Sequence, residues 1–144
     1  YKRQDKGCLI INGDCAYSQD IIRRVYESDR SCIATDSSIF NEENMKILIS
    51  NDKVTAISKS ITEKQGGITS IDLYNFSASD LEILNSIIEK YNQSGDRNKW
   101  TEVAINDLFS IQGISIQSLD IAGEKWIEID NHDDLEMARN LWRG

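Results

Sequence analysis

The chain has 144 residues, of which 40% are hydrophobic and 28% are charged, a composition typical of one globular domain with its own core. Its formal net charge of -8 argues against nucleic acid as a partner, because nucleic-acid backbones are bound by clustered Lys and Arg. No apolar run approaches the roughly 18 residues of a membrane-spanning helix, so the sequence predicts a cytoplasmic protein without a membrane partner.

The three cysteines, Cys8, Cys15 and Cys32, lie in or beside apolar runs and form no C-x-x-C pair. They are expected to be reduced core residues rather than a disulfide framework. A zinc site that added His132, the only histidine, would match no structural zinc spacing.

The first predicted elements form a β-α-β unit. Residues 8–12 are an apolar run and should be a buried strand, which Asn12-Gly13 ends with a sharp turn. A helix capped by Ser18 should extend to residue 26, with an apolar face formed by Ile21, Ile22, Val25 and Tyr26. Residues 31–36 complete the unit as a second strand.

The middle of the chain predicts a hairpin, a strand and a long helix. Residues 45–50 and 53–59 alternate with period 2 around a polar turn, and another strand is expected over residues 68–76. Ser79 and Glu82 have the spacing of a capping box at a helix start. An apolar helical stripe follows: Leu81, Leu84, Ile87, Ile88 and Tyr91.

The last third predicts an exposed loop over residues 93–99, a short helix over residues 100–109, and a second hairpin. The strands of this hairpin are residues 114–121 and 125–130. Asn131 should cap a final helix whose core-facing residues are Leu135, Ala138, Leu141 and Trp142. Together the elements predict the α/β class, with a layered mixed sheet and flanking helices in one domain over residues 1–144.

Two aspartates follow predicted strands near opposite ends of the chain, Asp14 after the first strand and Asp130 after the last. Open α/β sheets bind ligands at the carboxyl edge of their strands. Two carboxylates that converge there would form an oxygen-only site suited to Mg²⁺, which commonly combines protein carboxylates with substrate phosphates. The pattern therefore predicts nucleotide or phosphate chemistry.

The order of several short segments resembles the C-terminal portion of the nucleotidyltransferase family that makes NDP-sugars and CDP-alcohols, with bacterial phosphocholine cytidylyltransferases the most similar branch. These segments cover residues 10–14, 53–59, 66–77, 100–102, 126–130 and 133–138. The resemblance implies a Rossmann-like fold and a reaction that transfers a nucleoside monophosphate from an NTP, with CTP favoured, to a small phosphorylated acceptor such as phosphocholine or a sugar phosphate. Pyrophosphate would be released.

The same resemblance implies roles for individual residues. Asp14 and Asp130 correspond to Mg²⁺ ligands, and Lys59 to a catalytic contact with the acceptor's phosphate. Glu102 corresponds to an acidic residue that faces the acceptor. Trp126 and Tyr74, like Trp100, suggest substrate contacts because aromatic rings hold quaternary ammonium groups, although buried aromatic residues mostly fill core space.

One family motif is missing. The glycine-rich G-x-G-x-R loop, whose backbone amides cradle the triphosphate, occurs nowhere in the sequence. The nucleotide-binding N-terminal part of the family domain is therefore expected to lie outside these residues, and the chain alone should be inactive. The expected partners are an NTP, a phosphorylated substrate, and either the missing N-terminal segment or further copies of the chain.

Two other functions stay open. A nucleotide-sugar glycosyltransferase also places metal-binding acids at a strand end, but the expected D-x-D is absent around Asp14. A non-catalytic regulatory or scaffolding domain would keep the fold with its cleft filled or covered, whereas a catalytic one should hold Asp14 and Asp130 close together at an open site. Asp130 would otherwise be a capping acid, and Glu102 a first-turn acid favoured by the helix dipole.

Overall fold

The structure is a computed structural model that describes residues 7–95 and 101–143. Its strands are β1 (Cys8–Ile11), β2 (Cys15–Tyr17), β3 (Cys32–Asp36), β4 (Lys46–Ser50), β5 (Lys53–Ser58), β6 (Ile68–Phe76), β7 (Gln117–Asp120) and β8 (Trp126–Glu128). Its helices are α1 (Gln19–Tyr26), α2 (Ala78–Gln93), α3 (Thr101–Phe109), α4 (His132–Leu141) and the short 3-10 helix η1 (Glu63–Gln65). The predictions for residues 96–99 and for Trp100 lie outside the described residues.

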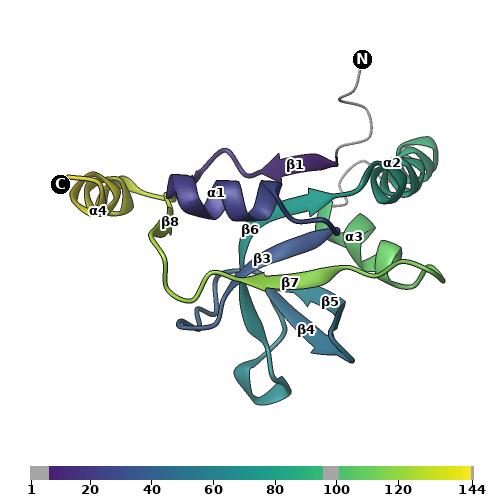
Figure 1. Ribbon diagram of the computed structural model, residues 1–144, viewed down its shortest axis with the longest axis horizontal. Helices are drawn as coiled ribbons and strands as arrows, with labels where there is room; N and C mark the ends of the chain where they lie inside the picture. Colours follow the sequence, from purple (N-terminus) through teal and green to yellow (C-terminus); the bar gives the residue numbers. More distant parts are fainter. Residues whose placement is uncertain (1–6, 96–100, 144) are drawn as a thin grey trace.

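The main sheet is mixed and has β6 at its centre (Figure 1). The order is β5-β4-β6-β3-β7, and β1 pairs with β6 as well. Because Ile10 and Ile33 both pair with Tyr74, β1 and β3 lie on opposite edges of β6. β7 is parallel to β3, whereas β1, β3 and β4 are all antiparallel to β6. The predicted α/β class with a mixed sheet is confirmed.

The predicted second hairpin is wrong. The turn at Ala122 and Gly123 exists, with φ angles of 48° and 76°, but the strands on its two sides do not pair with each other. β7 pairs with β3, and β8 leaves the sheet to pair with β2 in a separate two-stranded ribbon. A local sequence pattern indicates a strand but not its partner. Here β8 pairs with β2, a strand that was not predicted.

Helices cover both faces of the sheet. Residues of β3 alternate between two hydrophobic clusters, since Cys32 and Ala34 belong to one cluster and Ile33 to the other. The first cluster contains Ile21 and Val25 of α1. The second contains residues of α2 and α3, among them Leu84, Ile87, Ala104, Ile105 and Leu108. The core is therefore split into two layers, one on each side of the sheet.

Serine side chains begin two of the helices. Ser18 caps α1 as predicted, with its hydroxyl oxygen accepting a hydrogen bond from the N–H of Ile21. The cap of α2 is Ser77, which accepts from the N–H of Asp80, so the predicted cap at Ser79 is wrong by two residues. None of the helices in the described ranges is long and apolar enough to cross a membrane.

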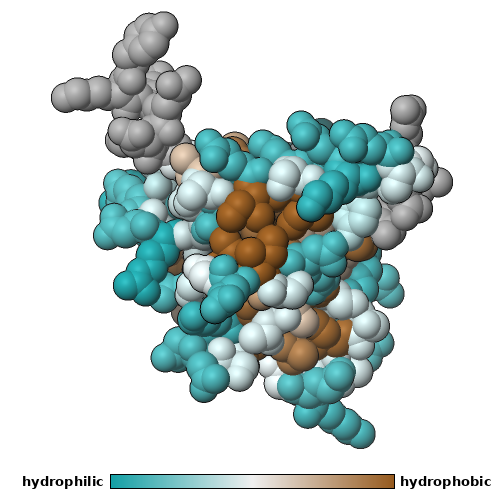
Figure 2. Space-filling view, turned by 90° about the vertical axis from the view of Figure 1, so that its right-hand side faces the viewer, coloured by the Kyte–Doolittle hydropathy of each residue, from teal (hydrophilic) through white to brown (hydrophobic). Residues whose placement is uncertain are grey.

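Some residues predicted for the core are more exposed than expected. Tyr26 is 53% exposed at the end of α1, Trp142 is 40% exposed after α4, and Ile11 is 45% exposed at the end of β1. Each lies at the end of its element, where fewer neighbours can cover it. Figure 2 shows further apolar side chains on the side of the molecule that carries α2 and α3, in areas bordered by hydrophilic residues.

Candidate functional site

The ribbon of β2 and β8 brings the two predicted aspartates together. Cys15 pairs with Glu128 across the ribbon. The N–H of Ile129 donates a hydrogen bond of 2.8 Å to the carbonyl oxygen of Asp14. Asp14 and Asp130 therefore lie at the same end of the ribbon, although they come from opposite ends of the chain.

Asp14, Glu128 and Asp130 form an acidic cluster whose candidate ligand oxygens all lie within 4.8 Å of one another. Asp14 and Asp130 are exposed and Glu128 is half-buried. The donors are all carboxylate oxygens, which suit a hard divalent cation such as Mg²⁺. Sequence analysis did not single out Glu128, although its spacing of two from Asp130 places both side chains on one side of an extended chain.

The electrostatics of the acidic cluster also suit a cation. Burial raises the pKa of Glu128. Three neighbouring carboxylates raise it further: those of Asp130, Asp72 and Asp14. The side-chain amide of Asn44, a buried residue just before β4, donates a hydrogen bond to Glu128 and fixes its orientation. A bound cation would relieve the repulsion among these carboxylates.

Asp130 is held by its backbone rather than used as a helix cap. Its N–H donates a hydrogen bond of 3.0 Å to the carboxylate of Asp134. The cap of α4 is Asn131, whose side-chain oxygen accepts from the N–H groups of Asp133 and Asp134. The capping role considered for Asp130 thus belongs to Asn131, as predicted for that residue, while the exposed carboxylate of Asp130 turns towards Asp14 and Glu128.

Asp72 lies in the middle of β6 and was not among the predicted site residues. It is 6% exposed and has a φ of 56°, a value that few residues other than glycine adopt within a strand. The N–H of Asn12, at the end of β1, donates a hydrogen bond of 3.3 Å to its carbonyl oxygen. Burial raises its pKa, and the carboxylates of Glu102 and Asp14 add to this increase. The charge of Asp14, in the acidic cluster, and that of Glu102 therefore both act on Asp72.

The charges of Lys59 and Glu102 also act on Asp72. Lys59 follows β5 and is exposed, while Glu102 is half-buried in the first turn of α3. The ammonium of Lys59 opposes the increase in the pKa of Asp72. The side chain of Asn106 fixes α3 against β5, since it accepts from the N–H of Ile57 at 2.9 Å and donates to its carbonyl oxygen at 2.6 Å. The structure thus brings Lys59 and Glu102 into the neighbourhood of Asp72.

The two predicted aromatic contacts have different surroundings. Tyr74 is 2% exposed in the core, where its hydroxyl donates to Asp72 and its ring stacks on Phe76 with centroids 6.3 Å apart. Its position therefore supports the placement of Asp72 rather than a direct ligand contact. Trp126 is half-buried, and its indole N–H donates a hydrogen bond of 2.9 Å to Asp36. It also lines a groove of about 590 Å³ that Glu128 and Asp130 share.

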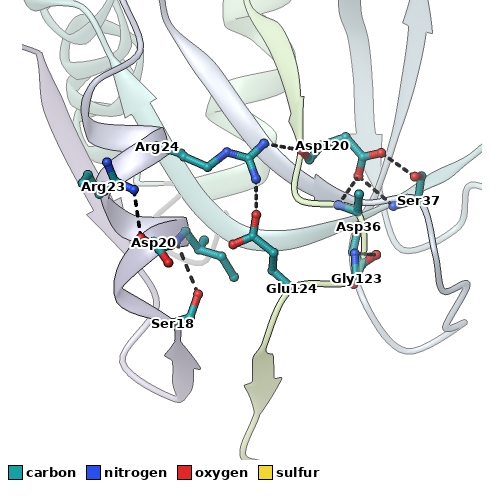
Figure 3. Close-up of polar contacts among 11 residues, drawn as sticks. Ser18, Asp20, Arg23, Arg24, Asp36, Ser37, Asp120, Gly123 and Glu124 are labelled. Atoms are coloured by element: carbon teal, nitrogen blue, oxygen red, sulfur yellow. Dashed lines mark hydrogen bonds and ion pairs between the residues drawn. The ribbon is translucent and has the colours of Figure 1, made fainter.

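Polar contacts fix the loops that follow β3 and β7 (Figure 3). The guanidinium of Arg24, in α1, donates to the carbonyl oxygen of Asp120 at 2.9 Å and forms an ion pair with Glu124. The carboxylate of Asp120 accepts from the N–H of Ser37, and that of Asp36 from the N–H of Gly123. These contacts hold the segment that leads from β7 to β8 and so position the acids at its end.

The chain is similar to known proteins in its fold, although no sequence comparison finds a match. No model of a protein family and no curated protein sequence matches the chain. A putative glucose-1-phosphate thymidylyltransferase from Bacillus anthracis superposes with a TM-score of 0.72 and 20% identity, over 96% of this chain and 55% of that protein. The inositol-1-phosphate CTP transferase from T. maritima gives 0.69 and 16% identity, over 96% and 57%.

A third solved structure is the CTP:phosphocholine cytidylyltransferase from Streptococcus pneumoniae, with a TM-score of 0.60 and 16% identity, over 92% of this chain and 57% of that protein. The chain therefore spans a little more than half the length of these proteins. Over that span it has the fold of nucleotidyltransferases, and the fold resemblance expected from the sequence is confirmed.

Proposed function

We propose that this chain forms the metal-binding and acceptor-binding part of a nucleotidyltransferase. The enzyme transfers a nucleoside monophosphate from an NTP to a small phosphorylated acceptor and releases pyrophosphate. The observation that carries the proposal is the open cluster of Asp14, Glu128 and Asp130, on a fold shared with solved nucleotidyltransferases.

In this reaction a phosphate oxygen of the acceptor attacks the α-phosphorus of the NTP. A new P–O bond forms as the bond from the α-phosphorus to the bridging oxygen breaks, and pyrophosphate leaves with the electron pair of that bond. Asp14, Glu128 and Asp130 would hold Mg²⁺, which supplies neutralisation of phosphate charge. Lys59 binds the acceptor's phosphate, and Glu102 faces the acceptor from the start of α3.

CTP is the favoured nucleotide, and phosphocholine or a sugar phosphate the favoured acceptor. Two of the similar structures carry CTP in their names, one with inositol 1-phosphate and one with phosphocholine. We assign the binding of the triphosphate to residues beyond these 144, because no G-x-G-x-R sequence occurs here and the chain covers only 55% and 57% of the first two similar proteins. The reaction takes place in the cytoplasm in this proposal, in agreement with three free cysteines.

The open state of the acidic cluster favours catalysis over a regulatory or scaffolding role. A domain that had lost its reaction would be expected to have this cleft filled. Asp14 and Asp130 are instead both exposed, and their carboxylates approach Glu128 closely enough to share one cation. A cation bound between these carboxylates would relieve their mutual repulsion.

Pyrophosphate release tests the proposal directly. The full-length protein that contains this chain is incubated with MgCl₂, each of CTP, UTP and dTTP in turn, and phosphocholine or glucose 1-phosphate. We expect release with at least one pair, and we expect D14N and D130N to lower kcat by about 100-fold or more, since each removes a charged ligand at the reacting phosphates.

D29N is the matched control, because Asp29 is an exposed aspartate in the loop before β3 and lies outside the acidic cluster. It should keep the wild-type kcat. Wild-type turnover in D14N and D130N, or the absence of pyrophosphate release with every pair, would contradict the proposed reaction.

A further inference from the structure

Lys46 is a buried charge outside the acidic cluster. This residue of β4 is only 1% exposed. Its ammonium donates a hydrogen bond of 2.6 Å to the carbonyl oxygen of Glu42 and lies 5.6 Å from the ring centroid of Phe40. Within the described ranges 7–95 and 101–143, no carboxylate forms an ion pair with it. Lysine is almost never fully buried without an ionic partner, so this burial calls for an explanation.

A second lysine acts on the charge of Lys46. Burial lowers the pKa of Lys46, and the charge of Lys59 lowers it as well, whereas Glu42 and Glu43 oppose the decrease. Lys46 and Lys59 both line a hollow of about 640 Å³, together with Phe40, Lys64 and the three glutamates Glu42, Glu43 and Glu63. The charges of Lys46 and Lys59 repel each other, and an anion with two negative charges between them would turn this repulsion into attraction.

The hollow adjoins the acidic cluster. Glu43 lines both this hollow and the groove that Glu128 and Asp130 share, and the neighbouring Asn44 donates its amide hydrogen bond to Glu128. The ammonium of Lys59 also lowers the pKa of Glu128 against the effect of its acidic neighbours. An anion held by the two lysines would therefore lie beside the metal-binding carboxylates.

We propose that Lys46 and Lys59 together bind the dianionic phosphate or phosphonate group of the acceptor. Lysine binds phosphate as a point charge from a flexible stem, and two such charges match a monoester dianion. The assignment of this anion to the acceptor rests on the proposed function. Lys46 is held in place by Glu42 and Phe40 before the ligand arrives, while the exposed Lys59 closes on it from the end of β5.

Binding of phosphocholine to the metal-free full-length protein, measured by calorimetry, tests the lysine pair. K46M and K59M should each raise the Kd about 10-fold or more, because each removes a charged hydrogen-bond donor. K53M is the matched control, since Lys53 is an exposed lysine at the opposite end of β5, and its Kd should stay within about twofold of wild type. Equal affinities in all four proteins would overturn the proposal.

A second measurement leaves the buried lysine in place. In wild-type protein with ¹³C-labelled lysine side chains, NMR titration should show that inorganic phosphate raises the pKa of Lys46, because an adjacent anion favours the charged ammonium. An unchanged titration of Lys46 at saturating phosphate would overturn the proposal even where K46M fails to fold.

Competing ligands identify the source of the anion. Glucose 1-phosphate and inorganic phosphate should displace phosphocholine. Glycerophosphocholine is a diester with one negative charge, so its Kd should be at least about 10-fold higher than that of phosphocholine. Displacement by CTP, together with an equal loss of CTP affinity in K46M, would assign the lysine pair to the triphosphate and overturn its role in acceptor binding.

Variants of the acidic cluster distinguish a failure of the lysine proposal from a failure of the proposed function. D14N should still bind phosphocholine in the absence of metal. If K46M and K59M bind it as wild type does while D14N has lost turnover, only the lysine proposal fails. If phosphocholine binding depends on both lysines while D14N and D130N turn over normally, the lysine site stands and the proposed catalytic function fails.

Discussion

The hydroxyl group of Tyr74 donates a hydrogen bond of 2.9 Å to the carboxylate of Asp72, two residues earlier on β6. Burial raises the pKa of both groups, and the carboxylates of Glu102 and Asp14 raise that of Asp72 further. Asp72 also adopts a φ of 56°. A buried acid in a sparsely populated backbone conformation is costly, and such residues concentrate at functional sites.

The charge of Asp72 should therefore cost stability. D72N keeps an acceptor for Tyr74 and a side chain that tolerates positive φ, but it cannot ionise. Because the pKa of Asp72 in the folded protein lies above its ordinary value of 3.8, wild-type stability falls as the pH rises from about 3.8 through the raised pKa. We expect D72N to have a free energy of unfolding on the order of 1 kcal/mol higher than wild type above that range, with no difference below pH 3.8.

Urea unfolding between pH 3 and pH 8 measures this difference. D52N is the matched control, because Asp52 has a φ of 61° but is exposed in the hairpin turn. Its stability should stay within about 0.5 kcal/mol of wild type at every pH. A D72N curve that runs parallel to the wild-type curve would show that the carboxylate of Asp72 is not destabilising.

Divalent cations should stabilise the protein through the acidic cluster. Binding to the folded state alone adds about 1.4 kcal/mol to the free energy of unfolding when the metal concentration is ten times its Kd. We expect MnCl₂ or MgCl₂ to produce this increase in wild-type protein and D29N, and to have no effect in D14N. An equal increase in D14N would place the bound cation away from Asp14.

Strong local patterns made part of this structure predictable. The β4–β5 hairpin follows from two alternating runs around Asn51 and Asp52, which do adopt positive φ angles of 50° and 61°. The separation of β7 from β8 was not predictable, because it depends on a distant partner strand. Nor does the sequence alone show that Lys46 and Asp72 are buried, since a charged residue in an alternating strand is normally an exposed one. Asp72 lies on β6, the central strand, and Lys46 lies on β4, which is enclosed between β5 and β6.

Asn106 should be essential for the position of α3. β5 is the last strand of the sheet order, and the amide of Asn106 satisfies both backbone groups of Ile57 there. N106A leaves these groups without protein partners, so we expect a loss of about 2 kcal/mol in the free energy of unfolding. The acceptor KM should rise as well, because the same amide binds the carbonyl oxygen of Glu102. N92A, at an exposed position of α2, should change neither quantity.

Asp36 should show the opposite pH dependence to Asp72. It is 2% exposed, and burial alone would raise its pKa, but hydrogen bonds from Ser38, Trp126 and Gly123 outweigh this effect and lower it below 3.8. The stability that its carboxylate contributes is therefore fully present above pH 3.8 and lost as the pH falls through the lowered pKa. In D36N an N–H₂ group replaces one accepting oxygen and faces these donors, so we expect a loss of about 2 kcal/mol at pH 7.

W126F removes one donor only and should cost about 1 kcal/mol. Urea unfolding at pH 7 and near pH 2.5 measures both variants, and a difference between wild type and D36N that fails to shrink at the lower pH would show that these hydrogen bonds do not favour the ionised form of Asp36.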